Sequence, residues 1–477
     1  MKQQPPRTSS HQSAAEANRI KFEFGKRWLL FAALTCGLLW FSASVQRSVQ
    51  FFQGKPPAPS VDFLVYYTAG LVARQDDNRL YSYRETADPN NPEKTIVVNP
   101  QLDIANPDSP YARVAKDVTK ASLNQYLYPP FFALLVSPLT HLPFQIAVPV
   151  WYFLTYLFIG LSIFLTVKMF YKNSLTAILA AGLIMFLAEF TFPLQDLLWV
   201  GNVGAIVLFF CAAAIYLQKN NRPTLSALFI ALAVFVKLTP LIIVPLMIMR
   251  RQWKWLAAFA GWSVLLLAIN LWHLGWQNHR EFVTKIMPAM SNGIAEHNNR
   301  SLLSVFQFIE LRKVPNIIDI ENGTVALTTY SNILFKMFVG LILLGVLYYS
   351  WRVNKTSSKL IAEMYSLLLL SLIVSPVSWR HGYVLTIVPL IFIWLHPLTQ
   401  KWSVVELLLL TAATVSVFSV LPDYAMAVSN AFLFQILMVL VMPTGVLISI
   451  FLLLKIQRSS NDALDGNIAL QSQDENA

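Results

Sequence analysis

Long apolar segments recur along the chain and are separated by short polar stretches. A helix needs roughly 20 residues to cross about 30 Å of hydrocarbon, and several of the segments approach or exceed that length. They are 28–46, 145–167, 175–193, 203–218, 255–272, 331–351, 361–377, 383–396, 404–421 and 426–454. The pattern predicts an all-α integral membrane protein with about 10–12 transmembrane helices. No small-residue cleavage site follows the first segment, so we expect a retained span.

Three apolar pieces are too short or too interrupted for a full crossing: 128–143, 225–240 and 240–249. The first begins with paired prolines, and the second carries Lys237 deep in its apolar run. Proline lacks an amide donor and restricts the residue before it. Irregular backbone persists at membrane depth only inside protein or beside water. We therefore expect short broken or re-entrant helices around a hydrated cavity; proline kinks packed against neighbouring helices are the alternative.

Composition agrees with a membrane environment, because 56% of the 477 residues are hydrophobic and 13% are charged. The net charge is +11, but the basic residues form short clusters at the ends of apolar segments. Such clusters favour the cytoplasmic side, whereas nucleic-acid binding would need one continuous patch. This places both termini in the cytoplasm. The loops that begin at Arg47, Phe192, His273, Trp379 and Pro422 then face outward.

The predicted organisation is one membrane domain, 21–458, between two polar cytoplasmic tails, 1–20 and 459–477, that we expect to be disordered. The longest extracytoplasmic loop, 47–127, holds nine basic and nine acidic residues and is therefore neutral. Both cysteines fall within apolar spans, so no disulfide framework is predicted.

Asp62 differs from the other ionisable residues in its position. It follows the first apolar span closely, in the stretch VDFLVYYTAGLVARQDDNRLYSY. An acid at or near hydrocarbon depth is costly to keep and is by default a hypothesis of function. The alternative is an N-cap, in which the Asp62 side chain accepts from backbone amides at the start of the next helix.

Other polar side chains gather in segments that we place on the outer face. They lie in QDLLWVGNVG (Gln195, Asp196, Asn202), in EHNNRSLLS (His297, Asn298, Asn299, Arg300) and in SPVSWRHGYV (Ser378, Trp379, Arg380, His381). Each type has an ordinary alternative: Asn and Gln cap helices, Trp lies at the membrane interface, Arg extends toward headgroups, and a single His is often structural. Their common side of the membrane predicts a polar site beside Asp62.

Several kinds of chemistry have no support in the sequence. The seven histidines are scattered without a two-ligand spacing and no cysteine pair accompanies them, so no metal site or redox cofactor is predicted. The absence of a phosphate-binding glycine loop argues against a cytosolic nucleotide as the direct substrate. A substrate delivered through the lipid fits better.

Six sequence blocks resemble glycosyltransferase family 87, in that family's order, from about residue 60 to residue 395. They are VDFLVYYTAG with LYSY, YLYPPFFALLVSPLTHLP, GNVGAIVLFF, ALAVFVKLTPLIIVPLMIMRRQWK, NRSLLSVF and SPVSWRHGYV. The resemblance implies the GT-C fold, a multispan helical membrane fold with its active site on the non-cytoplasmic side. It also implies polyprenyl-phosphate-linked sugars, typically mannose, as donors.

The resemblance gives Asp62 the role of general base, which takes the proton of the acceptor hydroxyl as that oxygen attacks the anomeric carbon. The polyprenyl phosphate leaves from the opposite face, so the anomeric configuration inverts, and nearby cations stabilise the leaving group. His381 matches the histidine of the family's SW-x-H block and is expected to contact the donor. The candidate substrate-binding residues are His381, Arg380, Arg300, Asn299, Lys237, Asn202, Tyr128 and Tyr66.

The chain departs from the family pattern at several positions. Asn202 and Gly204 replace a Gln and a second Asn, and Gly382 replaces a second His. Arg380 and Arg300 add two cations, which predict tighter phosphate binding or an anionic acceptor.

The outer stretch 74–127 is rich in Pro, Asn and Asp and longer than the family needs. This composition predicts an ordered surface loop with turns that covers the acceptor cleft. An insertion without a role in the reaction is the alternative.

The expected partners are a polyprenyl-phosphate sugar, a lipid or glycan acceptor and membrane lipids, with no nucleic acid and no cofactor. We expect a bacterial cytoplasmic membrane, with the active site facing outward. Two other functions stay open. A flippase or transporter for lipid-linked sugars would also need a wet cavity and broken helices, and an oligosaccharide ligase would use the same class of donor.

Overall fold

The computed structural model describes residues 61–75, 78–88, 91–97, 105–106, 108–119, 124–291, 293, 298–313, 329–352, 357–398, 402–421 and 436–456, with scattered residues between 27 and 38. Most of this part of the chain is helical, and the all-α membrane fold predicted from the apolar pattern is confirmed. The predicted tails, 1–20 and 459–477, and most of the first predicted span lie outside the described residues, as does His297.

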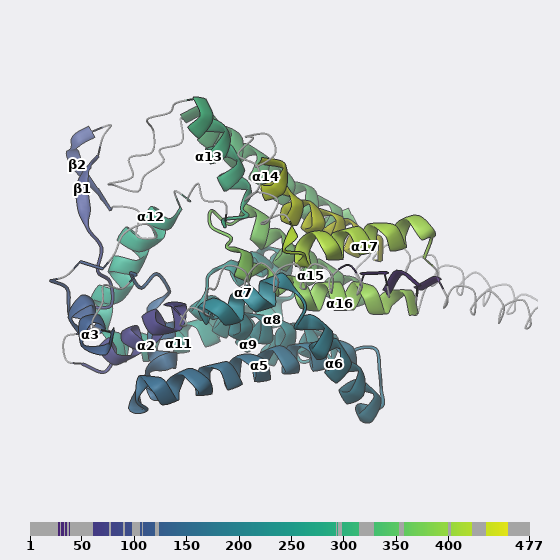
Figure 1. Cartoon of the computed structure of the whole chain (residues 1–477), viewed down its shortest axis with the longest axis horizontal. Coiled ribbons are helices and arrows are strands. Elements are labelled where there is room, and N and C mark those ends of the chain that lie inside the picture. Colours follow the sequence, from purple (N-terminus) through teal and green to yellow (C-terminus); the bar gives the residue numbers. More distant parts are fainter. Residues whose placement is uncertain are drawn as a thin grey trace, which may run out of the picture.

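Helices follow one another along the chain, with one short hairpin among them (Figure 1). The first half contains α2 (Val61–Val72), β1 (Glu85–Asp88), β2 (Asn91–Val97), α3 (Pro110–Thr119), α4 (Pro130–Val136), η1 (Ser137–His141), α5 (Phe144–Lys168), α6 (Ser174–Ala188), α7 (Phe192–Val200), α8 (Gly204–Lys219), α9 (Pro223–Val236), η2 (Thr239–Ile242) and α10 (Ile243–Met249). The second half contains α11 (Trp253–Glu281), η3 (Phe282–Ile286), α12 (Met287–Met290), α13 (Leu302–Lys313), α14 (Thr329–Arg352), α15 (Ser357–Val374), η4 (Arg380–Thr386), α16 (Ile387–Leu395), η5 (His396–Leu398), α17 (Val404–Phe418) and a last helix, Ile436–Ile456.

Three described helices are long and apolar enough to cross a bilayer: Phe144–Lys168, Trp253–Met290 and Ile436–Ile456. The pair α6–α7 would be a fourth span, although it is bent by 76°. The chain bends where Thr191 precedes α7 and Pro193 lies in its first turn, because proline lacks the amide hydrogen that would continue α6. Eight shorter apolar helices lie in the described part of the chain, so the number of crossings stays a prediction.

The centre of the bundle is formed by α8, which packs between α5 and α9, while α9 packs against α11. Small residues such as Ala205 and Ala212 are buried along α8 and let neighbouring backbones approach closely. By contrast, α6 exposes Leu179 (66%) and Phe186 (62%). A helix with this apolar surface faces lipid rather than water.

The stretch after α2, which the sequence predicts to be extracytoplasmic, is folded onto the end of α11. Glu85 of β1 pairs with Lys285 of η3, with 2.6 Å between carboxylate and ammonium. The Asn278 side chain accepts from the N–H of Leu80 and donates to the carbonyl of Asn78. The β1–β2 hairpin projects from the bundle in Figure 1, while α3 packs against α2. The loop composition predicts the turns here, but neither the hairpin nor α3.

Exposed tryptophans mark both ends of the apolar part of α11. Trp253 is 63% exposed and Trp272 is 86% exposed. They are about 19 residues apart, or roughly 29 Å at 1.5 Å per residue, which is close to the thickness of the hydrocarbon layer. Gly275 then interrupts the helix with a φ of 68°. The segment before Gly275 thus fits one crossing, and the segment after it carries the contacts with residues 78–85.

Two carboxylate–cation pairs lie away from these outer contacts. Glu363 of α15 binds the guanidinium of Arg250 through both carboxylate oxygens, and both side chains are buried. Glu406 of α17 pairs with Lys455 of the last helix. These pairs join helix ends that the basic clusters predict to be cytoplasmic.

Candidate active site

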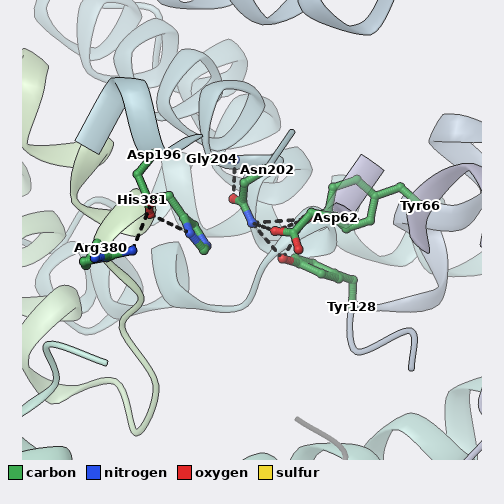
Figure 2. A network of polar contacts seen from close by, with 8 residues as sticks. All are labelled: Asp62, Tyr66, Tyr128, Asp196, Asn202, Gly204, Arg380 and His381. Atoms are coloured by element: carbon green, nitrogen blue, oxygen red, sulfur yellow. Dashed lines mark hydrogen bonds and ion pairs between the residues drawn. The ribbon is translucent and has the colours of Figure 1, made fainter. Parts of the chain in front are cut away.

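Asp62 lies in the first turn of α2 and is partly buried. Its Oδ2 accepts a hydrogen bond from Nδ2 of Asn202 at 2.7 Å and a longer one from the Tyr66 hydroxyl at 3.5 Å (Figure 2). No donor in the described part of the chain reaches Oδ1. Because Val61 already belongs to the helix and the carboxylate contacts side chains, Asp62 is a first-turn residue rather than the N-cap.

The backbone at the end of α7 determines how Asn202 meets Asp62. The helix ends at Gly201, whose φ of 70° lies in the left-handed region that favours glycine. The Gly201 carbonyl accepts from the indole Nε1 of Trp151 at 2.9 Å. Asn202 is 1% exposed, and its Oδ1 accepts from the N–H of Gly204 at 2.9 Å. Because a donor occupies Oδ1, Nδ2 is the atom that faces the Asp62 carboxylate.

Two tyrosines complete the network around Asp62. The Tyr66 hydroxyl, one turn along α2, donates to the Tyr128 hydroxyl at 2.9 Å, and the two rings meet edge to face. Nδ2 of Asn202 lies 3.1 Å from the first hydroxyl and 3.3 Å from the second. Burial, and after it the Asp62 charge, raises the pKa of Tyr128 well above its usual value. Tyr128 therefore stays protonated and retains a hydrogen that it can donate.

A cavity of about 470 Å³ lies beside this network. It is bounded by the loop before α4, the break after α9, η3 and α12, α14, and the end of α15 with the segment that follows it. Its polar wall includes Tyr128, Lys237 and Trp379, and its apolar wall includes Met287 and Leu343. The short, proline-broken pieces predicted a hydrated cavity; a cavity is present beside them, most of its lining is apolar, and its hydration stays a prediction.

Lys237 lies in the cavity wall where α9 ends. Its backbone is extended, with φ −153° and ψ 128°, and η2 follows with Pro240 in its first turn. Pro240 helps to end α9, since it lacks the amide hydrogen that would bond the carbonyl of Val236 if the helix continued. No side chain or carbonyl among the described residues binds the Lys237 ammonium, although the Asp62 carboxylate acts on it electrostatically. The mostly apolar cavity wall therefore contains one amino group that no described residue binds.

Arg380 and His381 begin η4 and meet Asp196 of α7 (Figure 2). Nη2 of Arg380 lies 3.3 Å from Oδ1 of Asp196, and Nδ1 of His381 lies 3.3 Å from Oδ2. The Arg380 guanidinium also lies over the Phe192 ring, 5.0 Å from its centre. In Figure 2 the His381 ring lies on the side of Asp196 that faces Asn202. Arg380 and His381, both predicted to bind the sugar donor, thus contact the same partly buried carboxylate, that of Asp196.

Asn299 and Arg300 hold the backbone before η4. Asn299 forms an antiparallel bridge with Trp379, and the N–H of Arg300 donates to the Ser378 carbonyl at 2.8 Å. The Asn299 Oδ1 accepts from the Ser378 N–H at 2.8 Å. Both Asn299 and Arg300 are 0% exposed, and the Arg300 guanidinium donates to the Met438 carbonyl at 3.3 Å. Neither residue lines the cavity.

Six of the predicted site residues form two polar groups, and α7 connects the two groups. The first group contains Asp62, Tyr66, Tyr128 and Asn202, and the second contains Arg380 and His381. The pairing of Asp196 was not predicted, although an acid inside a short apolar helix is the same signal that distinguishes Asp62. Within the described residues, no three His, Cys, Asp or Glu side chains come together as a metal site would require.

The comparisons with known proteins give one match. The sequence model of glycosyltransferase family 87 matches residues 126–376, a little more than half of the chain. This range contains Tyr128, Asn202 and Lys237, whereas Asp62 and His381 lie outside it. No curated protein matches the sequence.

Proposed function

We propose that this chain, which belongs to glycosyltransferase family 87, moves a hexose from a polyprenyl-phosphate donor to a hydroxyl of a lipid or glycan acceptor. Family membership makes it a membrane glycosyltransferase. The donor class, the non-cytoplasmic site and inversion at the anomeric carbon are our proposal. Mannose is the sugar that the sequence resemblance favours.

The proposal rests on the hydrogen bonding of the two carboxylate oxygens of Asp62. Oδ2 is held by Asn202 at 2.7 Å, while Oδ1 has no donor in the described part of the chain. A general base needs a fixed carboxylate with one oxygen available to the proton it removes. Tyr128, which contacts the same Asn202 side chain, also lines the cavity. A substrate in the cavity would therefore reach the network that holds Asp62.

The transfer step follows from this arrangement. The acceptor hydroxyl gives its proton to Oδ1 of Asp62 while its oxygen bonds to the anomeric carbon of the sugar. The bond from that carbon to the phosphate oxygen breaks, and the polyprenyl phosphate leaves with the electron pair. Attack opposite to the leaving group inverts the anomeric configuration. Asn202 steadies the carboxylate during the step, because its Nδ2 hydrogen bond restricts rotation of Asp62.

The charge on the departing phosphate needs stabilisation more than it needs an acid, and cations supply it. Lys237 is the cation that the cavity itself offers, and His381 is proposed to contact the phosphate from η4. Arg380 is paired with Asp196, so its charge is partly compensated. Asn299 and Arg300 are proposed to act indirectly, by holding the backbone that leads into η4.

The apolar part of the cavity is proposed to receive the first isoprene units of the donor lipid. Met287, Met290 and Leu343 line that part, and flexible methionine side chains adapt to irregular apolar ligands. The sugar would then lie toward Tyr128 and Asp62, and the phosphate beside Lys237.

The experiment is a transfer assay with the full chain in lipid nanodiscs. A panel of synthetic polyprenyl-phosphate sugars, including mannose and glucose, is supplied with a membrane lipid extract, and products are identified by mass spectrometry. We expect one added hexose on a lipid or glycan and release of the polyprenyl phosphate. Two results would overturn the proposal: no new glycosidic bond with any donor, or transfer of a preassembled oligosaccharide only. In vesicles, movement of the intact donor across the bilayer without transfer would instead indicate a flippase.

A further inference from the structure

Asp196 has a partly buried carboxylate that contacts both residues at the start of η4. Its side chain is 12% exposed, and those of Arg380 and His381 are 21% and 12% exposed. One oxygen faces Nη2 of Arg380 and the other faces Nδ1 of His381, each at 3.3 Å. Ions kept from water in this way are costly unless each is paired. The double contact therefore pairs one acid with two partly buried polar groups.

The contact with His381 determines which ring nitrogen is available. A carboxylate can only accept, so Nδ1 carries the hydrogen when His381 and Asp196 share one. Nε2 is then the nitrogen left for another partner, and no described residue binds it. The second partner of a histidine commonly fixes its tautomer and ring direction in functional sites.

The arrangement differs from an ordinary buried ion pair elsewhere in the same chain. Glu363 uses both of its oxygens on one guanidinium, that of Arg250. Asp196 divides its oxygens between two residues, although the Phe192 ring already supports Arg380. If Asp196 served only to neutralise Arg380, it would not need to contact the imidazole.

The position of Asp196 on α7 connects this group to the proposed base. α7 is nine residues long and ends at Gly201, directly before the asparagine that holds Asp62. The same rigid element thus supports Asp62 from its C-terminal end and His381 from its side. Any shift of α7 would move both partners together, which preserves their spacing.

We propose that Asp196 is a positioning residue for the donor-phosphate site: it holds His381 with Nδ1–H toward α7 and Nε2 toward the reacting groups, and it compensates the charge of Arg380. This inference rests on the proposed function, because the group that Nε2 addresses is the phosphate of the donor. The carboxylate itself touches no substrate.

The first test measures directly which ring nitrogen of His381 carries hydrogen, and it does not require catalysis. The full chain in nanodiscs, with ¹⁵N-labelled histidine, is studied by NMR, and the His381 signals are identified by their loss in His381→Gln. We expect Nδ1 to carry hydrogen in the unaltered protein and Nε2–H to become the main neutral form in Asp196→Asn, as in free imidazole side chains. An unprotonated Nδ1 in the unaltered protein would overturn the inference, and this result requires only that the His381→Gln protein used for the assignment folds.

The second test is kinetic. Asp196→Asn is expected to lower kcat/KM for a polyprenyl-phosphate sugar by about 10- to 100-fold, the range for losing a hydrogen bond to a charged group, while KM for the acceptor changes less than about threefold. Asp196→Glu keeps the charge and both acceptor oxygens and should recover much of that loss. Glu363→Gln breaks the other buried pair and should lower thermal stability without changing the His381 tautomer or the donor KM.

The results of these tests distinguish failure of the role proposed for Asp196 from failure of the proposed function. Unaltered donor kinetics and tautomer in a folded Asp196→Asn protein would overturn the role of Asp196 while transfer itself stands. If the unaltered protein transfers no sugar from any donor, the proposed function fails, and the inference about the donor-phosphate site fails with it even if the tautomer is as expected.

Discussion

The hydrogen bond from Asn202 to Asp62 positions the proposed base. Its removal should impair that positioning more than it impairs binding of the sugar donor. Asn202→Ala deletes the Nδ2 donor that lies 2.7 Å from Oδ2 of Asp62. The carboxylate then keeps only the contact with the Tyr66 hydroxyl, at 3.5 Å. A hydrogen bond of this charged kind contributes about 1.5–3 kcal/mol. We therefore expect kcat to fall by roughly 10- to 100-fold, because the carboxylate rotates away from the acceptor.

The same substitution also affects the fold, and the assay must distinguish the two effects. Asn202 is 1% exposed, and its Oδ1 accepts from the N–H of Gly204, so Asn202→Ala leaves a buried amide unpaired at a cost of about 1–3 kcal/mol. Thermal unfolding and size-exclusion profiles in detergent show whether the protein remains folded at the assay temperature. Initial rates are then measured over a range of donor concentrations, so that kcat and the donor KM are obtained separately.

A matched control is available in α11. Asn270 is also 1% exposed but takes no part in the hydrogen bonds around Asp62, so Asn270→Ala should change stability without a comparable fall in kcat. Asn202→Asp should lose at least as much activity as Asn202→Ala, because it places a second acceptor against the carboxylate. A folded Asn202→Ala protein with unchanged kcat, or with a change confined to the donor KM, would refute the reasoning.

Three further predictions concern other parts of the chain. Gly204→Ala would place a Cβ 2.9 Å from Cδ1 of Leu197, so it should destabilise the protein by about 1–3 kcal/mol and lower the unfolding temperature. Lys237→Met removes the cation of the cavity wall while keeping an apolar chain of similar length, so the donor KM should rise by about tenfold, the effect of losing one charged hydrogen bond. Trp272 and Trp276 are exposed at 86% and 69%, and their fluorescence should be quenched most by lipids brominated near the headgroup, as expected for an interfacial position.

Each of these has its own control. Gly182 has open space around the position of a Cβ, so Gly182→Ala should leave the unfolding temperature unchanged or raise it slightly. Lys172→Met removes an exposed cation at another helix end and should not change the donor KM. Quenching that is strongest for bromines near the bilayer centre would contradict the depth assigned to α11, and normal donor kinetics in Lys237→Met would exclude Lys237 from phosphate binding.

The positions of the long helices could be predicted from the apolar pattern. The segment 145–167 became α5, Phe144–Lys168, and 255–272 lies within α11, Trp253–Glu281. The length of such a segment is set by the thickness of the hydrocarbon layer. Each segment satisfies this requirement independently of the rest of the chain. The break at Lys237 was also predictable, because a buried cation and a following proline are both local signals.

The pairing of residues far apart along the chain could not be predicted from the sequence. Asp196 meets Arg380 across 184 positions, and Asn202 meets Asp62 across 140. These contacts depend on how helices pack, and that packing is not encoded in any one segment. The same limit applies to Arg300, a predicted substrate-binding residue: the sequence did not indicate that its side chain is buried with the guanidinium on the Met438 carbonyl.

The role of Asp62 is tested most directly by Asp62→Asn in the transfer assay with a labelled polyprenyl-phosphate sugar. Asparagine keeps the size of the side chain but does not take up a proton, so we expect a loss of about 10²- to 10⁴-fold in kcat, the usual contribution of a general base, with donor binding retained. Asp108→Asn is the matched control, because Asp108 is an exposed acid of the same outer loop; its rate should equal that of the unaltered protein. Transfer by a folded Asp62→Asn protein at more than about a tenth of the normal rate would contradict the assignment of Asp62 as the base.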